Sequence, residues 1–239
     1  MTTEEAIILA RADAVLDLPK RLPLVAEFVA KWLASGHTCH VCYAWKLLEL
    51  AEWLKLNKPK HVVELGSGLT TAVFCNYFGN EYSEYGDLTP GSRFISVEED
   101  LNQITYMRAN LPNPCVEFLH AERIDFDLDG ADACRYNLEL PIADLGAIDL
   151  LYVDGPNCNN GKPGGRLGVD TVAFAEQIDN PRTILFDMRF SAARHFYQTC
   201  RWNKRYHFWP STAIAGEIMG TPWYLSGMRH HEIFQDSTA

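Results

Sequence analysis

The chain has 239 residues, of which 47% are hydrophobic, and its formal net charge is −10. This length suffices for the core of one domain, and we expect residues 1–239 to form a single domain in which residues 1–58 are an N-terminal helical cap. The negative charge and the lack of a lysine or arginine run argue against nucleic acid and leave a small molecule, a sugar or a protein as partner.

The expected compartment is the cytoplasm. The chain has no apolar stretch long enough for a membrane span and no basic-then-apolar leader. Its seven cysteines form no regular framework, which predicts reduced thiols.

Three helical patterns precede the first predicted strand. They cover residues 3–18, 23–34 and 41–56. The second has one apolar face, and Gly36 follows it as a C-cap; the residues expected on this face are Leu24, Val25, Phe28, Trp32 and Leu33. We expect most side chains of these three helices to pack in the core.

The segment from His61 to Thr71 combines an apolar run, an acid, a Gly-x-Gly and the start of a helical pattern. It predicts a strand, a tight turn and a helix N-terminus, where backbone N–H groups can face a ligand. A dinucleotide enzyme would have a third glycine in the place of Thr71. The acid Glu64 favours a cationic ligand group over a pyrophosphate. A strand-to-helix turn without a ligand is the alternative.

The pattern Glu64-x-Gly66-x-Gly68-x-Thr70 resembles the first motif of the class I S-adenosylmethionine-dependent methyltransferases. S-adenosylmethionine carries an amino group and a sulfonium, the kind of cationic groups that an acid suits. The resemblance implies that this cofactor binds at the turn, with Ser67 among its contacts.

A second apolar run covers residues 93–98 and ends in Glu98, which Glu99 and Asp100 follow. It begins about 30 residues after the first, as a βαβ unit requires. In the resembled family, an acid in the place of Glu98 accepts hydrogen bonds from ribose hydroxyls, with the residue in the place of Glu99 beside it. The alternative is that the three acids only favour the N-terminus of the next helix.

Three further apolar runs predict strands over residues 115–119, 147–153 and 183–186. Each precedes a polar loop, which is typical of a parallel sheet covered on both faces. By the resemblance, His120 and Ala121 after the first of these runs would line the adenine. We expect four acids at the edge of the sheet that is formed by the carboxyl ends of its strands, the carboxyl rim. These acids are Glu64, Glu98, Asp154 and Asp187.

The C-terminal part predicts a helix over residues 190–202 and two strands over residues 205–209 and 222–226. The resembled fold ends in an antiparallel pair at this place. We therefore expect an α/β fold of Rossmann-like type: a mostly parallel seven-stranded sheet with helices on both faces, an antiparallel last strand and an N-terminal helical extension.

The loop over residues 154–166 contains four glycines and two prolines and is longer than a plain connection needs. Its Asp-Gly-Pro start and Pro-Gly-Gly-Arg end are similar to a loop of methyltransferases that modify polysaccharide sugars. We expect it to close over a substrate, with Arg166 reaching an anionic or hydroxylated group. Plain solvent exposure is the alternative.

Asp154 and Asp187 resemble two acidic metal ligands of catechol-type O-methyltransferases. An asparagine follows the second acid in those enzymes, whereas Met188 follows it here, and a thioether suits magnesium poorly. We favour a metal-free route, with a divalent metal on the two acids as the alternative. Proton removal then falls to Asp154, Asp187 or His195, and His195 fits equally well as an exposed helix histidine.

The expected activity is the transfer of a methyl group from S-adenosylmethionine to a hydroxyl of a small molecule or sugar. One alternative is a nicotinamide-dependent oxidoreductase, which Thr71 and Glu64 disfavour. The other is a non-catalytic protein that keeps the fold and binds the cofactor.

Overall fold

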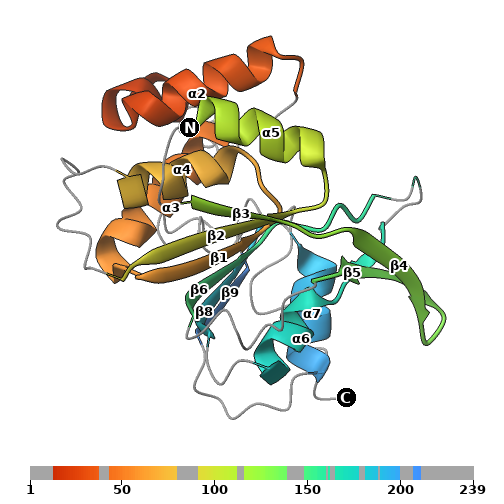
Figure 1. The fold of residues 1–239 in the computed structure, drawn as a ribbon. Coiled ribbons are helices and arrows are strands. Elements are labelled where there is room, and N and C mark those ends of the chain that lie inside the picture. Colours follow the sequence, from red (N-terminus) through yellow and green to blue (C-terminus); the bar gives the residue numbers. More distant parts are fainter. Residues whose placement is uncertain are drawn as a thin grey trace, which may run out of the picture.

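The fold is built on a six-stranded sheet (Figure 1). The computed structural model describes residues 13–37, 43–79, 91–111, 116–138, 148–159, 161, 165–177, 181–187, 189–199 and 207–210. The strands are β1 (His61–Leu65), β2 (Arg93–Glu98), β3 (Val116–His120), β6 (Ile148–Val153), β8 (Pro181–Phe186) and β9 (His207–Pro210). Their order is β3-β2-β1-β6-β8-β9, and all neighbours are parallel. The order reverses between β1 and β6, where open α/β sheets bind their ligands.

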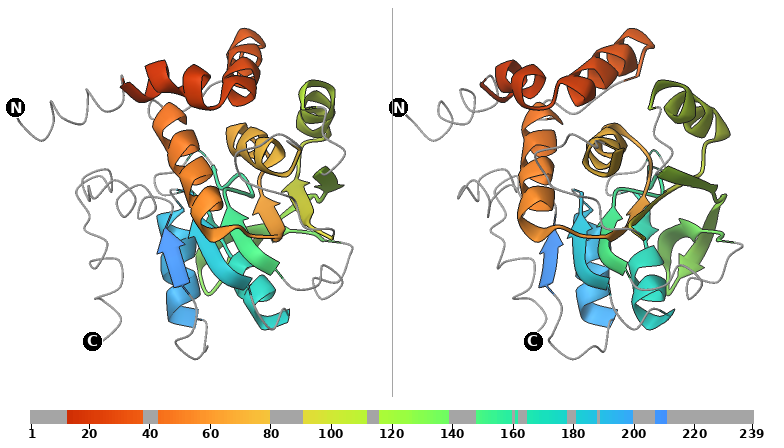
Figure 2. Two further views of the ribbon diagram at one scale, coloured as in Figure 1. Left: turned by 90° about the vertical axis from the view of Figure 1, so that its left-hand side faces the viewer. Right: turned by 60° about the vertical axis from the view of Figure 1, so that its left-hand side comes forward.

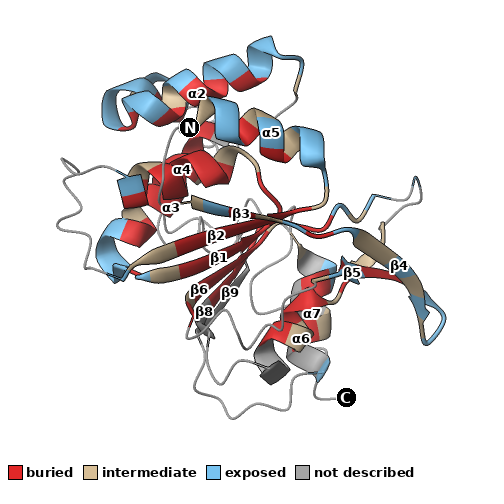
Figure 3. Ribbon diagram, in the orientation of Figure 1, coloured by how far each residue is buried: buried red, intermediate tan, exposed pale blue. Residues whose placement is uncertain are grey.

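Helices cover both faces of this sheet (Figures 1 and 2). One face carries α2 (Pro23–Ala34), α3 (Tyr43–Asn57), α4 (Leu69–Gly79) and α5 (Leu101–Asn110), and the other carries α6 (Asp170–Gln177) and α7 (Phe190–Thr199). Successive strand residues alternate between two cores, so that Val62 packs under α4 and Val63 packs under α6. Burial on both faces explains why the strands read as continuous apolar runs (Figure 3).

A second, three-stranded sheet extends from the first and was not expected. It consists of β4 (Arg123–Leu128), β5 (Ala131–Tyr136) and β7 (Leu167–Gly168). β4 and β5 form an antiparallel hairpin, and β7 joins β5 in parallel. The hairpin turn is Asp129-Gly130, with φ angles of 52° and 87°, the combination that a two-residue type I′ turn needs.

The expected α/β class, with a mostly parallel sheet and helices on both faces, is confirmed. The expected antiparallel last strand is the one over residues 222–226; the strand before it, expected over residues 205–209, is found as β9 and pairs with β8 in parallel. The physical reason is that β8, α7 and β9 form a strand–helix–strand unit, which returns the chain in the same direction. The strand expected over residues 222–226 lies outside the described residues, so six strands rather than seven are seen in the part described.

The helices ahead of β1 agree with the expected ranges, but Leu24 and Leu33, expected on the packed face of α2, are exposed because the buried stripe runs through Val25, Phe28, Val29 and Trp32. α2 begins with Pro23 in its first turn, and the expected C-cap Gly36 has φ +87° with its N–H on Leu33 O. Residues 13–21 are helical, and the earlier part of the expected first helix lies outside the described residues. Among the helices described, none combines the length and apolar character that crossing a membrane requires.

Candidate functional site

The turn between β1 and α4 lies where the strand order reverses. A methyl group on Gly66, which has φ +91°, would lie 2.7 Å from the amide nitrogen of Gly155, so only glycine fits where the β1 and β6 loops touch. A methyl group on Gly68 would meet no atom of a described residue within 4 Å. Gly66 therefore closes the turn against the neighbouring loop, and Gly68 faces space that a ligand can occupy.

Glu64 is fully buried and holds this turn together. Its carboxylate accepts three hydroxyl hydrogen bonds, each 2.7 Å long, from Thr70, Thr71 and Ser96. Burial raises the pKa of Glu64 to about 7, although the three hydroxyls oppose this shift. The sequence suggested contact with a cationic ligand group, but the observed contacts give Glu64 and Thr70 a structural role in the turn.

Glu98 joins the end of β2 to the same turn. Its Oε2 accepts the N–H of Ser67 at 2.9 Å and the side-chain amide of Gln103 at 3.2 Å. Its Oε1 accepts the N–H groups of Glu99 and Asp100 at 2.8 and 2.9 Å. Burial raises its pKa against the effect of these donors. The glycine turn and the expected ribose acid therefore form one hydrogen-bonded unit.

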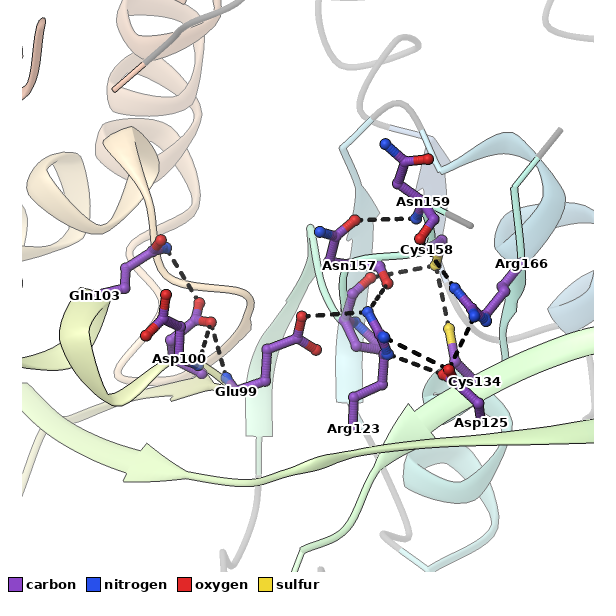
Figure 4. Close-up of polar contacts among 12 residues, drawn as sticks. Glu99, Asp100, Gln103, Arg123, Asp125, Cys134, Asn157, Cys158, Asn159 and Arg166 are labelled. Atoms are coloured by element: carbon purple, nitrogen blue, oxygen red, sulfur yellow. Dashed lines mark hydrogen bonds and ion pairs between the residues drawn. The ribbon is translucent and has the colours of Figure 1, made fainter. Parts of the chain in front are cut away.

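Glu99, His120 and Ala121 lie beside Glu98 at the same end of the sheet. His120 pairs with Glu98 in the strand register, and its Nε2 lies 3.1 Å from Glu99 O. The N–H of Ala121 donates to Glu98 O at 3.0 Å. One carboxylate oxygen of Glu99 lies 3.6 Å from Arg123, and the other is buried without a hydrogen-bond partner among the described residues (Figure 4). That oxygen is an acceptor available to a ligand hydroxyl or amine.

Asp187, at the end of β8, is almost completely buried, with 2% of its side chain exposed. The Lys46 ammonium of α3 donates to its Oδ2, and the Tyr152 hydroxyl donates to the same oxygen at 3.0 Å. Burial alone would raise the pKa of Asp187, but the charge and hydrogen bond of Lys46, together with the Tyr152 hydroxyl and the Arg189 charge, outweigh it and hold the pKa below its usual value. Asp187 is therefore a fixed carboxylate.

Asp154, at the end of β6, has different surroundings, and 33% of its side chain is exposed. The guanidinium of Arg189 donates to the Asp154 backbone carbonyl and lies 3.5 Å from its Oδ1. Loss of solvent around the carboxyl, followed by the negative charge of Asp187, raises the pKa of Asp154 well above its usual range. Asp154 is thus the acid of the pair that can take up a proton.

The residues at this rim do not fit a divalent metal. Both acids already contact a protein cation, Lys46 on Asp187 and Arg189 on Asp154. A metal ion would have to displace both cations or bind against their positive charge. The residue after Asp187 is Met188, a soft ligand that magnesium does not prefer.

Two predicted site residues have other partners. The hydrogen bond of His195 is to Thr199, 3.4 Å away on α7, and none joins it to Asp154 or Asp187 in the described part of the chain. Arg166 donates to Asn159 O at 2.9 Å and pairs with Asp125 at 3.0 Å (Figure 4). It therefore fastens its own loop to β4, in contrast to the expected reach toward a substrate.

Three residues at the carboxyl rim were not predicted from the sequence. They are Lys46, Arg189 and Tyr136. Arg189 follows the fifth predicted strand by three residues, so its position at the rim could have been inferred. Tyr136 ends the unexpected strand β5, and its hydroxyl contacts the Gly155 backbone. Lys46 pairs with a residue 141 positions away and has no local signal.

Comparisons with known proteins assign the chain to no family. No protein-family model matches the chain, and no curated protein matches it. One similar solved structure is the O-methyltransferase TomG from Streptomyces achromogenes, which is involved in tomaymycin synthesis and was crystallised in complex with SAM. The identity is 12% and the TM-score is 0.46, over 95% of this chain and 88% of the other.

Proposed function

We propose that this protein is an S-adenosylmethionine-dependent methyltransferase that acts on a hydroxyl oxygen of a small molecule or sugar without a metal ion. One observation carries the proposal: two acids end adjacent strands beside the glycine turn, and Asp187 is buried against Lys46 and Tyr152 whereas the side chain of Asp154 is 33% exposed beside Arg189. Acid–base chemistry requires titratable groups with different surroundings, and these two carboxyl groups have them. Bound S-adenosylmethionine would supply an electrophilic methyl group.

The residues that would hold the cofactor fit its polar groups. Gly68 leaves room beside the turn. The buried Glu99 oxygen without a partner can accept from a ribose hydroxyl, next to Glu98. His120 and Ala121 adjoin these acids at the end of β3, where the adenine would lie.

The acceptor hydroxyl must lose a proton as its oxygen attacks the methyl group. Asp154 is the base in this proposal, because its raised pKa favours proton uptake. Asp187 stays ionised and fixes the Lys46 ammonium, and Lys46 and Arg189 then stabilise negative charge that develops on the acceptor oxygen.

An oxidoreductase that binds nicotinamide is the second candidate, because six parallel strands in this order are typical of dinucleotide-binding sheets. The first turn of α4 argues against a dinucleotide site. Where dinucleotide folds place a third glycine, Thr71 is fully buried, donates to Glu64 and accepts the Gly68 N–H at 2.8 Å. The close helix–strand contact that a glycine would allow is filled by this side chain.

Calorimetric titration with S-adenosylmethionine, S-adenosylhomocysteine and NAD tests the proposal. We expect the two sulfur compounds to bind and NAD not to bind. Gly68→Ala should weaken binding slightly and Gly68→Val by about tenfold or more, which is roughly 1.4 kcal/mol, with unchanged circular dichroism and thermal unfolding. Binding of NAD alone would establish the second candidate instead.

A screen with methyl-labelled cofactor against phenols, catechols and sugars then tests transfer. We expect label on oxygen in the presence of a chelator. Activity that the chelator abolishes and magnesium restores would refute the metal-free route. Binding of the cofactor without transfer to any acceptor would favour a non-catalytic binding protein.

A further inference from the structure

Two cysteines from different parts of the chain lie in contact next to the candidate site. Cys134 is on β5 and Cys158 is in the loop that begins at Asp154, and their sulfurs are 3.5 Å apart (Figure 4). Both are free thiols. A disulfide bond has a sulfur–sulfur distance of about 2 Å, so the sulfurs need to approach by roughly 1.5 Å.

The backbone around Cys158 holds the two thiols together. Arg166 N donates to Cys158 O at 2.6 Å, and the Cys158 thiol donates to Pro156 O at 3.2 Å. A methyl group on Gly165 would lie 2.7 Å from Cys158 O, and one on Gly168 would lie 3.4 Å from Cys158 Sγ. Cys158 is therefore packed against two glycines, whose lack of a side chain leaves room for its backbone oxygen and its sulfur.

Arg123 and Asp125 fasten the same loop to the second sheet. Arg123 donates to Asn157 O at 2.9 Å and pairs with Asp125 at 2.8 Å, and Asp125 in turn pairs with Arg166 (Figure 4). The contact between the thiols thus belongs to a set of bonds that joins this loop to β4 and β5.

The two thiols are chemically different. Cys134 is fully buried, whereas Cys158 is partly exposed. The hydrogen bond from Cys134 lowers the pKa of the Cys158 thiol, and the Arg189 guanidinium lowers it further against the effect of burial. The same contact and burial raise the pKa of Cys134. Cys158 is therefore the nucleophile that reacts first, and Cys134 is the partner that reacts second.

We propose that Cys158 and Cys134 are a redox modification site, at which a small disulfide such as glutathione disulfide converts the thiol pair into a reversible disulfide. The Cys158 thiolate attacks one sulfur of the small disulfide, forms a mixed disulfide and releases one small thiolate. The Cys134 thiol gives its proton to the released small thiolate, and the resulting Cys134 thiolate attacks the Cys158 sulfur and releases the second small thiolate, which takes up from water the proton that Cys158 had lost. The two protein thiols lose two electrons, and one small disulfide becomes two thiols.

The bond would tie the first residues of the loop to β5. Cys134 and Tyr136 lie on the same side of β5, and Tyr136 already contacts Gly155, the residue after Asp154. The oxidised protein would thus have two fixed points between β5 and this loop. We expect the amides of residue 155 and of residues 157–159 to exchange hydrogen more slowly in the oxidised protein than in the reduced one.

The test incubates the reduced, full-length protein with glutathione disulfide and glutathione at several ratios, followed by alkylation and peptide mass spectrometry. We expect a linked 134–158 peptide that lacks two hydrogens and that dithiothreitol reverses. Cys134→Ser should accumulate one glutathione on Cys158, and Cys158→Ser should leave Cys134 unmodified. Cys75→Ser, a control in the buried core of α4, should leave the linkage intact.

Two results would overturn the proposal. One is full alkylation of both Cys134 and Cys158 at ratios that oxidise other cysteines of the chain. The other is a mixed disulfide in Cys134→Ser on a residue other than Cys158. Cys134→Ala serves if the buried serine impairs folding. None of these readouts depends on methyl transfer, so the proposed function can fail without affecting them.

Discussion

Asp154 and Asp187 end adjacent strands, yet their contacts give them different properties. Asp187 is buried against Lys46 and Tyr152 and stays ionised. Asp154 is partly exposed, its carboxylate lies 3.5 Å from Arg189, and it holds a proton more readily. The sequence predicted both acids at one rim, because each follows an apolar run. It could not rank them, since their partners come from α3 and from the loop after β8.

Asp154→Asn should lower the rate of methyl transfer by about 10²- to 10⁴-fold, because the base is lost, and should leave cofactor affinity nearly unchanged. In the wild type, kcat/KM should increase with pH as Asp154 loses its proton, above the usual range of an aspartate. This increase should be absent from the residual activity of the variant. A wild-type profile retained in Asp154→Asn would assign the proton to another group.

Lys46→Met should destabilise the protein by about 2–4 kcal/mol at neutral pH, because it leaves the buried Asp187 charge without its cation. The ion pair lowers the pKa of Asp187, so its stabilisation is present above the unfolded pKa and is lost as pH falls through the folded pKa. The difference in the free energy of unfolding between Lys46→Met and the wild type should therefore be smaller at acidic pH. Urea unfolding at several pH values measures this, with Lys46→Arg as the control that keeps the charge.

The β1–α4 turn shows what a sequence motif specifies at the scale of an element. The strand, the glycines and the helix start were predicted in place, because they depend on local chain geometry. The role of Glu64 was not, because its carboxylate is bound by hydroxyls six and seven residues later and by Ser96 on the next strand. The β4–β5 hairpin was also missed, although Asp129-Gly130 after the alternating residues 123–128 is a hairpin signal.

Thr71→Val should lower the free energy of unfolding by about 1–3 kcal/mol, because it removes a hydroxyl donor from buried Glu64 and an acceptor from the Gly68 N–H. Thr71→Ser keeps the hydroxyl and should lower the free energy of unfolding by less than Thr71→Val does. Denaturant titration of the two variants provides the comparison. Equal stability of Thr71→Val and the wild type would show that this hydroxyl does not hold the turn.

For the whole molecule, the sequence predicted the parallel sheet, because alternating strands and helices leave few other topologies. It did not predict how the net charge of −10 is distributed between surface and core. Three buried acids, Glu49, Glu64 and Asp170, have pKa values raised to about 8, 7 and 7, in each case first by burial. Between the unfolded and folded pKa values the native state binds more protons, so their contribution to stability is greatest in acid and is lost as pH rises toward about 8.

Glu49 gives the sharpest test of this pH dependence, because it is 4% exposed and both its carboxylate oxygens lack a hydrogen-bond partner among the described residues. Glu49→Gln removes the cost of ionising a buried acid whose pKa rises from 4.5 to about 8. We expect it to stabilise the protein by about 2–4 kcal/mol at pH 9 and to have little effect near pH 5, where Glu49 of the folded wild type is already neutral.

The matched control is Glu52→Gln on the same helix, where the side chain is 38% exposed and pairs with Arg21. That change should stay within about 0.5 kcal/mol at both pH values. Urea unfolding at the two pH values decides the matter, and an equal effect of Glu49→Gln at both would mean that folding does not raise the pKa of Glu49.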